Sequence, residues 1–284
     1  MTETNNLGDF LQFARAMLVG KTDTPGIDSQ VLAAHGIGKD RAWVLGHPEY
    51  RLAPSEKQFL MNGIERMVAG YPLPYIIQNK EFFGLDFFVT PDVLIPRPET
   101  ELLVEHALAW CQTVDHEIKA VDIGTGSGCI AISLAKNLSH LQMIGVDIST
   151  KALRVAYRNA RHQGVMDSVG FVQMNLVDGL CGKFDLVCAN LPYIPTQTLH
   201  QYEVSKYEPV LALDGGKTGI RLINKLLEGL GRVINRRGLI LLEIQSDQSE
   251  PVTALASELF PNSQIETIRD LADLPRLIKI ELNG

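Results

Sequence analysis

The sequence predicts an α/β protein, in which a mostly parallel sheet with helices on both faces follows a small helical domain. From residue 119 onward, short apolar runs alternate with stretches that have helical spacing. Strands without polar alternation are buried on both faces, which is typical of a parallel sheet covered by helices. Two further strand-like runs near the C-terminus, 264–269 and 276–282, predict an antiparallel pair at the edge of that sheet.

Three regions follow one another along the chain: we expect a helical domain over 1–75, a β-hairpin linker over 76–95 and the α/β domain over 96–284. The first region has apolar residues three or four positions apart, interrupted by Pro and Gly. Residues 76–90 are rich in Ile, Phe and Val around Gly84, which predicts a hairpin. In the third region we expect strands over 120–123, 143–146, 169–172, 184–189 and 239–244, and helices over 129–138, 149–163, 219–235 and 248–259.

Bulk properties exclude several classes of protein. The net charge is −7 and no dense Lys/Arg run occurs, so stable nucleic-acid binding is not expected, because such binding depends on cations that replace counterions. No apolar stretch reaches the ~20 residues of a membrane helix, and the first residues do not resemble a secretory signal. The four cysteines form no CxxC pair and have no His at zinc spacing. We therefore expect a cytoplasmic protein with no metal and no membrane association.

The first motif with chemical content is a glycine-rich turn between a strand and a helix. Glycines permit positive φ and let a ligand approach the backbone closely. Dinucleotide-binding proteins use a similar turn, so the glycines alone leave that class open. The Asp122 carboxylate before the turn would repel a pyrophosphate, whereas it would attract an ammonium group. The turn therefore favours a methyltransferase, whose cofactor has an amino-acid moiety with such a group. The residues we expect at this cofactor are Asp122, Gly124, Thr125, Gly126, Ser127 and Gly128.

A second carboxylate, Asp147, ends the next predicted strand. A carboxylate at this place in a second parallel strand commonly accepts hydrogen bonds from a ribose diol. The alternative is a helix N-cap, a role that Ser149 or Thr150 could also fill. We favour ribose binding.

The tetrapeptide Asn190-Leu191-Pro192-Tyr193 directly follows the predicted strand 184–189. Ligands of open α/β sheets bind at this end of the strands. An amide nitrogen is a poor nucleophile, and two acceptors, the Asn190 side-chain carbonyl and the Leu191 main-chain carbonyl, would orient it. Pro192 would fix the turn and Tyr193 would lie over the flat amide. The alternative is an ordinary Asn-Xaa-Pro loop.

Several longer motifs resemble the PrmC/HemK family of release-factor glutamine methyltransferases over essentially the whole chain. They are Pro74-Tyr75-Ile76 with Phe82-Phe83-Gly84, Val93–Glu101 (VLIPRPETE), Asp122–Gly128, Asn190–Tyr193, Glu208-Pro209 with Ala212–Gly216 (ALDGG), and Leu242-Glu243-Ile244. The chain departs from the family pattern at Leu191, where proline is usual, but the main-chain carbonyl is retained. It also has Asn175-Leu176 beside the expected adenine pocket, where an acidic residue is frequent.

The resemblance implies a class I Rossmann-like methyltransferase domain. The implied reaction transfers a methyl group from S-adenosyl-L-methionine to N5 of the glutamine in the Gly-Gly-Gln loop of a class 1 peptide chain release factor, leaving S-adenosyl-L-homocysteine. The helical domain would help to engage the release factor. Asn175, Leu176 and Asn190 would join the glycine turn and Asp147 at the cofactor.

The residues themselves leave other functions open. The same tetrapeptide serves enzymes that methylate an exocyclic amine of nucleic acid, and a glutamine of a ribosomal protein is another possible acceptor. A non-catalytic adenosine-binding module would not need Asn190–Tyr193. Glu99 and Thr100 begin a helix near the predicted site, where they could cap the helix or form a wall of the site, and the sequence leaves both roles open.

Overall fold

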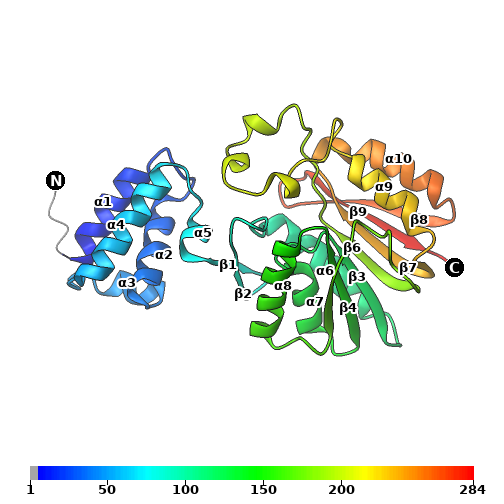
Figure 1. Cartoon of the computed structure of the whole chain (residues 1–284), viewed down its shortest axis with the longest axis horizontal. Helices are drawn as coiled ribbons and strands as arrows, with labels where there is room; N and C mark the ends of the chain where they lie inside the picture. Colours follow the sequence, from blue (N-terminus) through cyan, green and yellow to red (C-terminus); the bar gives the residue numbers. More distant parts are fainter. Residues whose placement is uncertain (1–5) are drawn as a thin grey trace. The chain divides into compact units, whose positions relative to one another are not determined.

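The computed structural model describes residues 6–284, which form two compact units that divide between Asn79 and Lys80 (Figure 1). Each unit has its own hydrophobic core. Across residues 6–284, no helix is long and apolar enough to cross a membrane.

The first unit is a helical bundle, as its apolar spacing predicts. Its buried residues, among them Leu7, Phe10, Leu32 and Leu60, come from facing sides of the longer helices. Asn6 caps the first helix by accepting a hydrogen bond from the Asp9 amide. The helices are α1 (Leu7–Leu18), α2 (Pro25–Ile37), α3 (Arg41–Gly46), α4 (Pro54–Val68) and α5 (Leu73–Ile77).

The hairpin is shorter than the sequence predicts. Its strands are β1 (Asn79–Phe82) and β2 (Leu85–Phe88), whereas Ile76 and Ile77 belong to α5. Phe83 and Gly84 form the turn, both with positive φ. The hairpin's Phe82 and Phe87 are fully buried in the core of the larger unit.

The larger unit contains a seven-stranded sheet in the order β5-β4-β3-β6-β7-β9-β8. The four strand pairs from β5 to β7 are parallel, and β9 runs antiparallel to both β7 and β8, which confirms the predicted edge pair. The strands are β3 (Ile118–Ile123), β4 (Leu141–Asp147), β5 (Val169–Gln173), β6 (Phe184–Ala189), β7 (Ile234–Glu243), β8 (Ser263–Arg269) and β9 (Pro275–Leu282).

Helices cover both faces of this sheet, so its central strands are buried on both sides (Figure 1). One face packs against α6 (Glu101–Cys111), α7 (Cys129–Asn137) and α8 (Thr150–Gln163), and the other against α9 (Arg221–Leu230) and α10 (Ser249–Leu259). The predicted helix 219–235 is too long at its C-terminal end, because the chain turns after Leu230 and enters β7 at Ile234.

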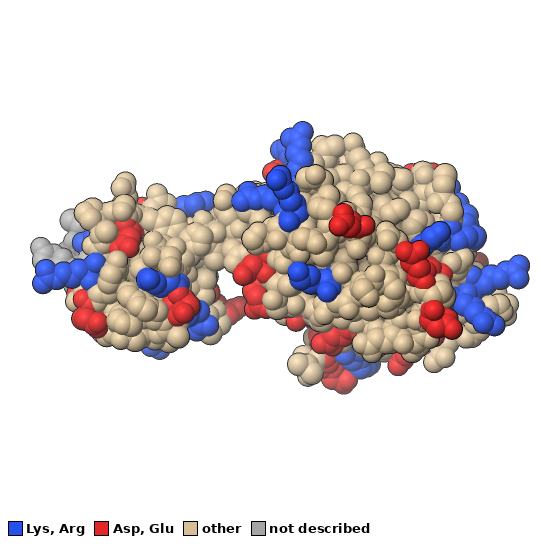
Figure 2. All heavy atoms as spheres, turned by 90° about the horizontal axis from the view of Figure 1, so that it is seen from below, with Lys and Arg blue, Asp and Glu red and all other residues tan. Residues whose placement is uncertain are grey.

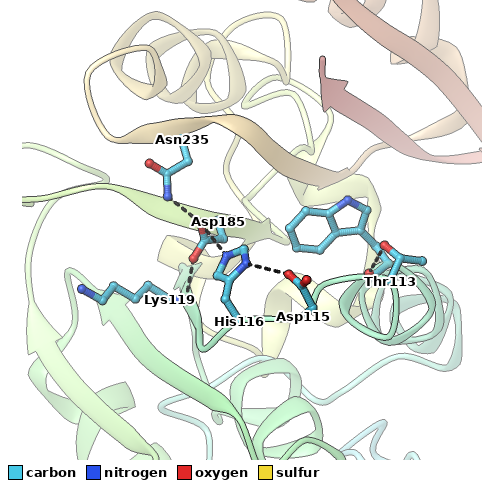
Figure 3. Close-up of polar contacts among 7 residues, drawn as sticks. Thr113, Asp115, His116, Lys119, Asp185 and Asn235 are labelled. Atoms are coloured by element: carbon cyan, nitrogen blue, oxygen red, sulfur yellow. Dashed lines mark hydrogen bonds and ion pairs between the residues drawn. The ribbon is translucent and has the colours of Figure 1, made fainter. Parts of the chain in front are cut away.

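A polar cluster holds the amino-terminal end of the sheet together (Figure 3). Asp185, at the start of β6, accepts hydrogen bonds from the Lys119 amide of β3 at 2.9 Å and from the Asn235 side chain of β7. His116 lies with Nε2 3.7 Å from the same carboxylate. This cluster joins three strands at the end of the sheet opposite to the predicted site.

Candidate active site

A cavity of about 500 Å³ lies in the larger unit, where β3, β4 and β6 end. Cavities of this size commonly hold a small-molecule ligand. Its lining includes ten of the residues that the sequence predicts for the site, namely Gly124, Thr125, Gly126, Ser127, Asp147, Asn175, Leu176, Asn190, Leu191 and Pro192. Asp122, Gly128 and Tyr193 are outside the lining. The structure thus brings the three predicted motifs together, and three of their residues act from behind the cavity wall.

The glycine turn forms one wall of the cavity because Gly124, Gly126 and Gly128 all adopt positive φ. A side chain at Gly128 would place Cβ 2.8 Å from Ile132 Cδ1 and 3.2 Å from Ala156 Cβ. Gly128 is also the N-cap of α7, directly before Cys129. Its role is therefore close packing of α7 against α8, and the other two glycines expose the backbone to the cavity.

Asp122 supports the glycine turn from inside the protein. It is fully buried, and its Oδ2 accepts a 2.7 Å hydrogen bond from the Thr125 hydroxyl. Burial raises its pKa to about 7, although this bond and the Ala131 amide favour the ionised form. The carboxyl group thus lies behind the turn and fixes Thr125, which does line the cavity.

Asp147 presents a carboxylate that backbone amides hold in place. Oδ2 accepts from the Gly126 amide at 3.0 Å and Oδ1 from the Ser149 amide at 2.8 Å. Burial raises its pKa, and these amides act in the opposite direction. The N-cap of α8 is Ser149, whose hydroxyl accepts from the Ala152 amide. The helix cap is therefore provided by Ser149, and Asp147 remains available to a ligand.

Asn175 and Leu176 line the cavity beyond β5. The Asn175 amide donates from Nδ2 to Asp178 Oδ2 at 2.9 Å. Because Nδ2 faces Asp178, the Oδ1 atom of Asn175 is left to accept a hydrogen bond from a ligand. Leu176 has a φ of 51° and is buried, so it contributes an apolar surface at this place.

The tetrapeptide after β6 is anchored on both sides. Asn190 Nδ2 donates to the Thr100 hydroxyl at 3.0 Å. The Leu191 side chain is 4% exposed and packs in the core beside Gly124. The main-chain carbonyl of Tyr193 accepts from Gln248 Nε2 at 2.9 Å. Burial raises the pKa of the Tyr193 phenol to about 12.

Three further residues shape this site, and the sequence had assigned a definite role to none of them. Thr100 lines the cavity, contacts Asn190 and makes no capping hydrogen bond at α6, which favours the wall over the cap among the two roles that the sequence left open. Glu243 ends β7 as a buried carboxyl group next to Thr100 and Asn190. An acid that interrupts an apolar strand was the available signal for Glu243. Asn159 of α8 donates from Nδ2 to the Ser127 carbonyl at 2.8 Å, but it gave no signal because it lies within an ordinary helix. In the described part of the chain, no group of three or more His, Cys, Asp or Glu side chains is placed to hold a metal ion.

The fold and this cavity together define a Rossmann-like methyltransferase domain with a helical domain before it. Residues 98–206 match the family model described as methyltransferase small domain, and residues 9–77 match the one described as PrmC N-terminal domain. A solved methyltransferase from Pyrococcus furiosus shares the fold, with a TM-score of 0.52 and 16% identity over 81% of this chain and 98% of that one.

Curated relatives identify the family. The chain is 39% identical to the release factor glutamine methyltransferase of Moorella thermoacetica, over 93% of this chain and 94% of the relative. It is 37% identical to the protein of the same name from Geobacter sulfurreducens, over 87% of each. The chain belongs to the release factor glutamine methyltransferase family.

Proposed function

We propose that this protein transfers a methyl group from S-adenosyl-L-methionine to the side-chain amide nitrogen, N5, of the glutamine in the Gly-Gly-Gln loop of a class 1 peptide chain release factor. Family membership supports this reaction. The structural observation that supports it most directly is Asn190-Leu191 at the wall of the same cavity as Asp147 and the glycine turn. These two residues would offer acceptors for an NH₂ group beside a surface suited to an adenosine cofactor.

The residues that line the cavity fit this cofactor. Gly124–Ser127 would contact its amino-acid part, Asp147 would accept from the ribose hydroxyls, and Asn175 with Leu176 would hold the adenine. When bound, the cofactor supplies an electrophilic methyl group on a sulfonium. The fit rests on a backbone that two positive-φ glycines open toward the cavity and on a carboxylate that two amides pin at its wall.

The protein's own contribution is to orient the acceptor amide. An amide nitrogen is a poor nucleophile because its lone pair is delocalised. The enzyme must therefore hold the two N–H groups in order to point this nitrogen at the methyl group. Asn190 Oδ1 and the Leu191 main-chain carbonyl would each accept one of them, which fixes the nitrogen for in-line attack and stabilises the charge that develops on it. Tyr193 would maintain the turn. After transfer, the nitrogen loses its extra proton to solvent.

Two other methyl acceptors are alternatives to the release factor glutamine: a glutamine of a ribosomal protein and an exocyclic amine of nucleic acid. On the face that Figure 2 shows, the Lys and Arg side chains of the described residues are interspersed with Asp and Glu and do not merge into one basic tract. With a net charge of −7, this distribution favours a protein substrate and no stable complex with nucleic acid. A release factor substrate also places the enzyme in the cytoplasm, which we propose as its compartment.

The experiment is transfer of labelled methyl groups to four acceptors: a class 1 release factor, its loop variant with the glutamine replaced by alanine, a ribosomal protein mixture and rRNA. We expect label on the first alone. Label on the alanine variant would exclude the loop glutamine as the site, and label on rRNA or ribosomal protein would transfer the assignment to that acceptor.

A further inference from the structure

A buried carboxyl group lies directly behind the residue that would hold the acceptor amide. Ala189 of β6 pairs with Leu242 of β7, so Asn190 and Glu243 are the next residues along two neighbouring strands. Glu243 is 4% exposed. Thr100 and Asn190 lie near its carboxyl group and lower its pKa, while one oxygen, Oε2, has no partner within the described residues.

The same side chains determine which way the Asn190 amide points. Nδ2 of Asn190 donates to Thr100 Oγ1 at 3.0 Å. An ionised carboxylate only accepts hydrogen bonds, so it can face the NH₂ end of an amide and not the carbonyl end. Thr100 therefore takes up the NH₂ end of Asn190, and the neighbouring Glu243 carboxylate favours the same end, which leaves Oδ1 as the end available to the cavity.

We propose that Thr100 and Glu243 are positioning residues that hold the Asn190 amide in the one orientation that offers Oδ1 to the substrate. The proposal rests on the proposed function, because it assigns a purpose to the orientation of Asn190 in amide methylation. Neither residue is catalytic, since both act through Asn190. A flipped Asn190 would present NH₂ to the NH₂ of the substrate, where two donors oppose one another.

This arrangement makes the site sensitive to pH. Burial raises the pKa of Glu243 to about 7, and the neighbouring Glu99 carboxylate raises it further, whereas Thr100, Arg276 and Asn190 lower it. Tyr193 and Cys129 also face Glu243, and each has its own pKa raised in part by that carboxylate. A protonated Glu243 can donate as well as accept, so it no longer excludes the flipped amide. Turnover should therefore rise as pH increases through the pKa of Glu243.

The test compares the wild type with T100V, T100S and E243Q, using a release factor as acceptor. We expect kcat to fall about tenfold in T100V and, at pH 8, in E243Q, which corresponds to the loss of about one hydrogen bond. The KM for the release factor and the Kd for the cofactor should stay near wild-type values. T100S retains the hydroxyl and should restore kcat. E243Q should also lose the rise of activity around pH 7 that the wild type shows.

Three outcomes decide the proposal. Unchanged kcat and pH profile in both T100V and E243Q would overturn it, as would a fall in kcat matched by an equal loss of cofactor affinity. If either variant fails to fold, the wild type provides the second readout: the side-chain NH₂ resonances of Asn190, assigned by their absence in N190D, should shift with pH around 7. Resonances that do not move would overturn the proposal. A wild type that folds but methylates no release factor would refute the proposed function. The pH titration of the Asn190 resonances would still test whether Glu243 acts on the Asn190 amide.

Discussion

Arg97 and Glu208, 111 residues apart in the chain, form an ion pair at the edge of the active-site cavity. The other oxygen of Glu208 accepts from the Ile95 amide at 3.1 Å, and the Glu208 side chain is almost completely buried. The pair thus joins the segment before α6 to the segment that begins at Pro209, and both segments line the cavity.

Loss of the arginine should destabilise the larger unit. In R97A, Glu208 would remain buried without its counter-charge, and we expect the free energy of unfolding to fall by about 2–3 kcal/mol, at the low end for a broken buried pair because Arg97 is partly exposed. Urea denaturation measures the change. The matched control is R97A/E208Q, in which the neutral glutamine can still accept from Ile95. The double variant should be more stable than R97A, and equal stability of the two would contradict this role.

Asn159 of α8 connects the hairpin to the glycine turn. Its Nδ2 donates to the carbonyls of Phe88 and Ser127 at 3.0 and 2.8 Å, and its Oδ1 accepts from the Phe88 amide at 2.8 Å. Because each unsatisfied buried group costs about 1–3 kcal/mol, N159A should lower the free energy of unfolding by about 2–4 kcal/mol. Cofactor affinity should also fall, since Ser127 lines the cavity. If calorimetry gives N159A the same cofactor Kd as the wild type, the glycine turn does not depend on the hydrogen bond from Asn159 to Ser127.

Gly215 packs against the backbone of the catalytic turn. A Cβ at this position would lie 2.2 Å from the Gly219 carbonyl oxygen and 2.7 Å from the Pro192 carbonyl oxygen, and the Gly215 amide donates to the Ile194 carbonyl at 2.8 Å. In G215A the turn must move, so we expect turnover to decrease at least tenfold, in line with the known sensitivity of catalysis to small displacements. G170A is the control, because a Cβ there meets no atom within 4 Å. Equal activity of the two variants would argue against this packing role.

Asp122 should make the stability of the protein depend on pH. Its pKa is raised to about 7 in the folded state, from an ordinary value of 3.8. Between these values the folded state binds more protons than the unfolded state, so the contribution of Asp122 to stability is present at low pH and is lost as pH rises toward 7. D122N does not titrate. Its free energy of unfolding relative to the wild type should therefore increase from about pH 4 to pH 7 and then level off.

This comparison needs denaturation curves of both proteins at several pH values. If the free energies of unfolding of D122N and the wild type differ by the same amount from pH 4 to pH 8, Asp122 has the same pKa in the folded and unfolded states.

The sequence predicted the sheet well because its signals are local. The run Phe184–Ala189 is bounded by polar or turn residues and is apolar except at Asp185, and β6 has these same limits. The strands near the C-terminus alternate apolar and polar residues, as their place at the sheet edge requires. Helix α9 was overextended because Val233 and Ile234 continue its apolar spacing, although they already lead into β7. Local periodicity does not decide between helix and strand at these two residues.

The site was predictable only where one short motif contains its own chemistry. The glycine turn, Asp147 and Asn190 could be assigned in this way, and the cavity brings them together. Contacts between distant segments left no such signal: Thr100 is 90 residues from Asn190, and Arg97 is further still from Glu208.

The most direct test of the central claim is N190A, measured by mass spectrometry of the release factor loop peptide together with cofactor binding by calorimetry. The claim is that Asn190 orients the acceptor amide. It predicts a peptide one methyl group heavier after incubation with the wild type and an unmodified peptide with N190A, while the cofactor Kd changes much less. A loop peptide that N190A methylates as fast as the wild type would contradict the claim.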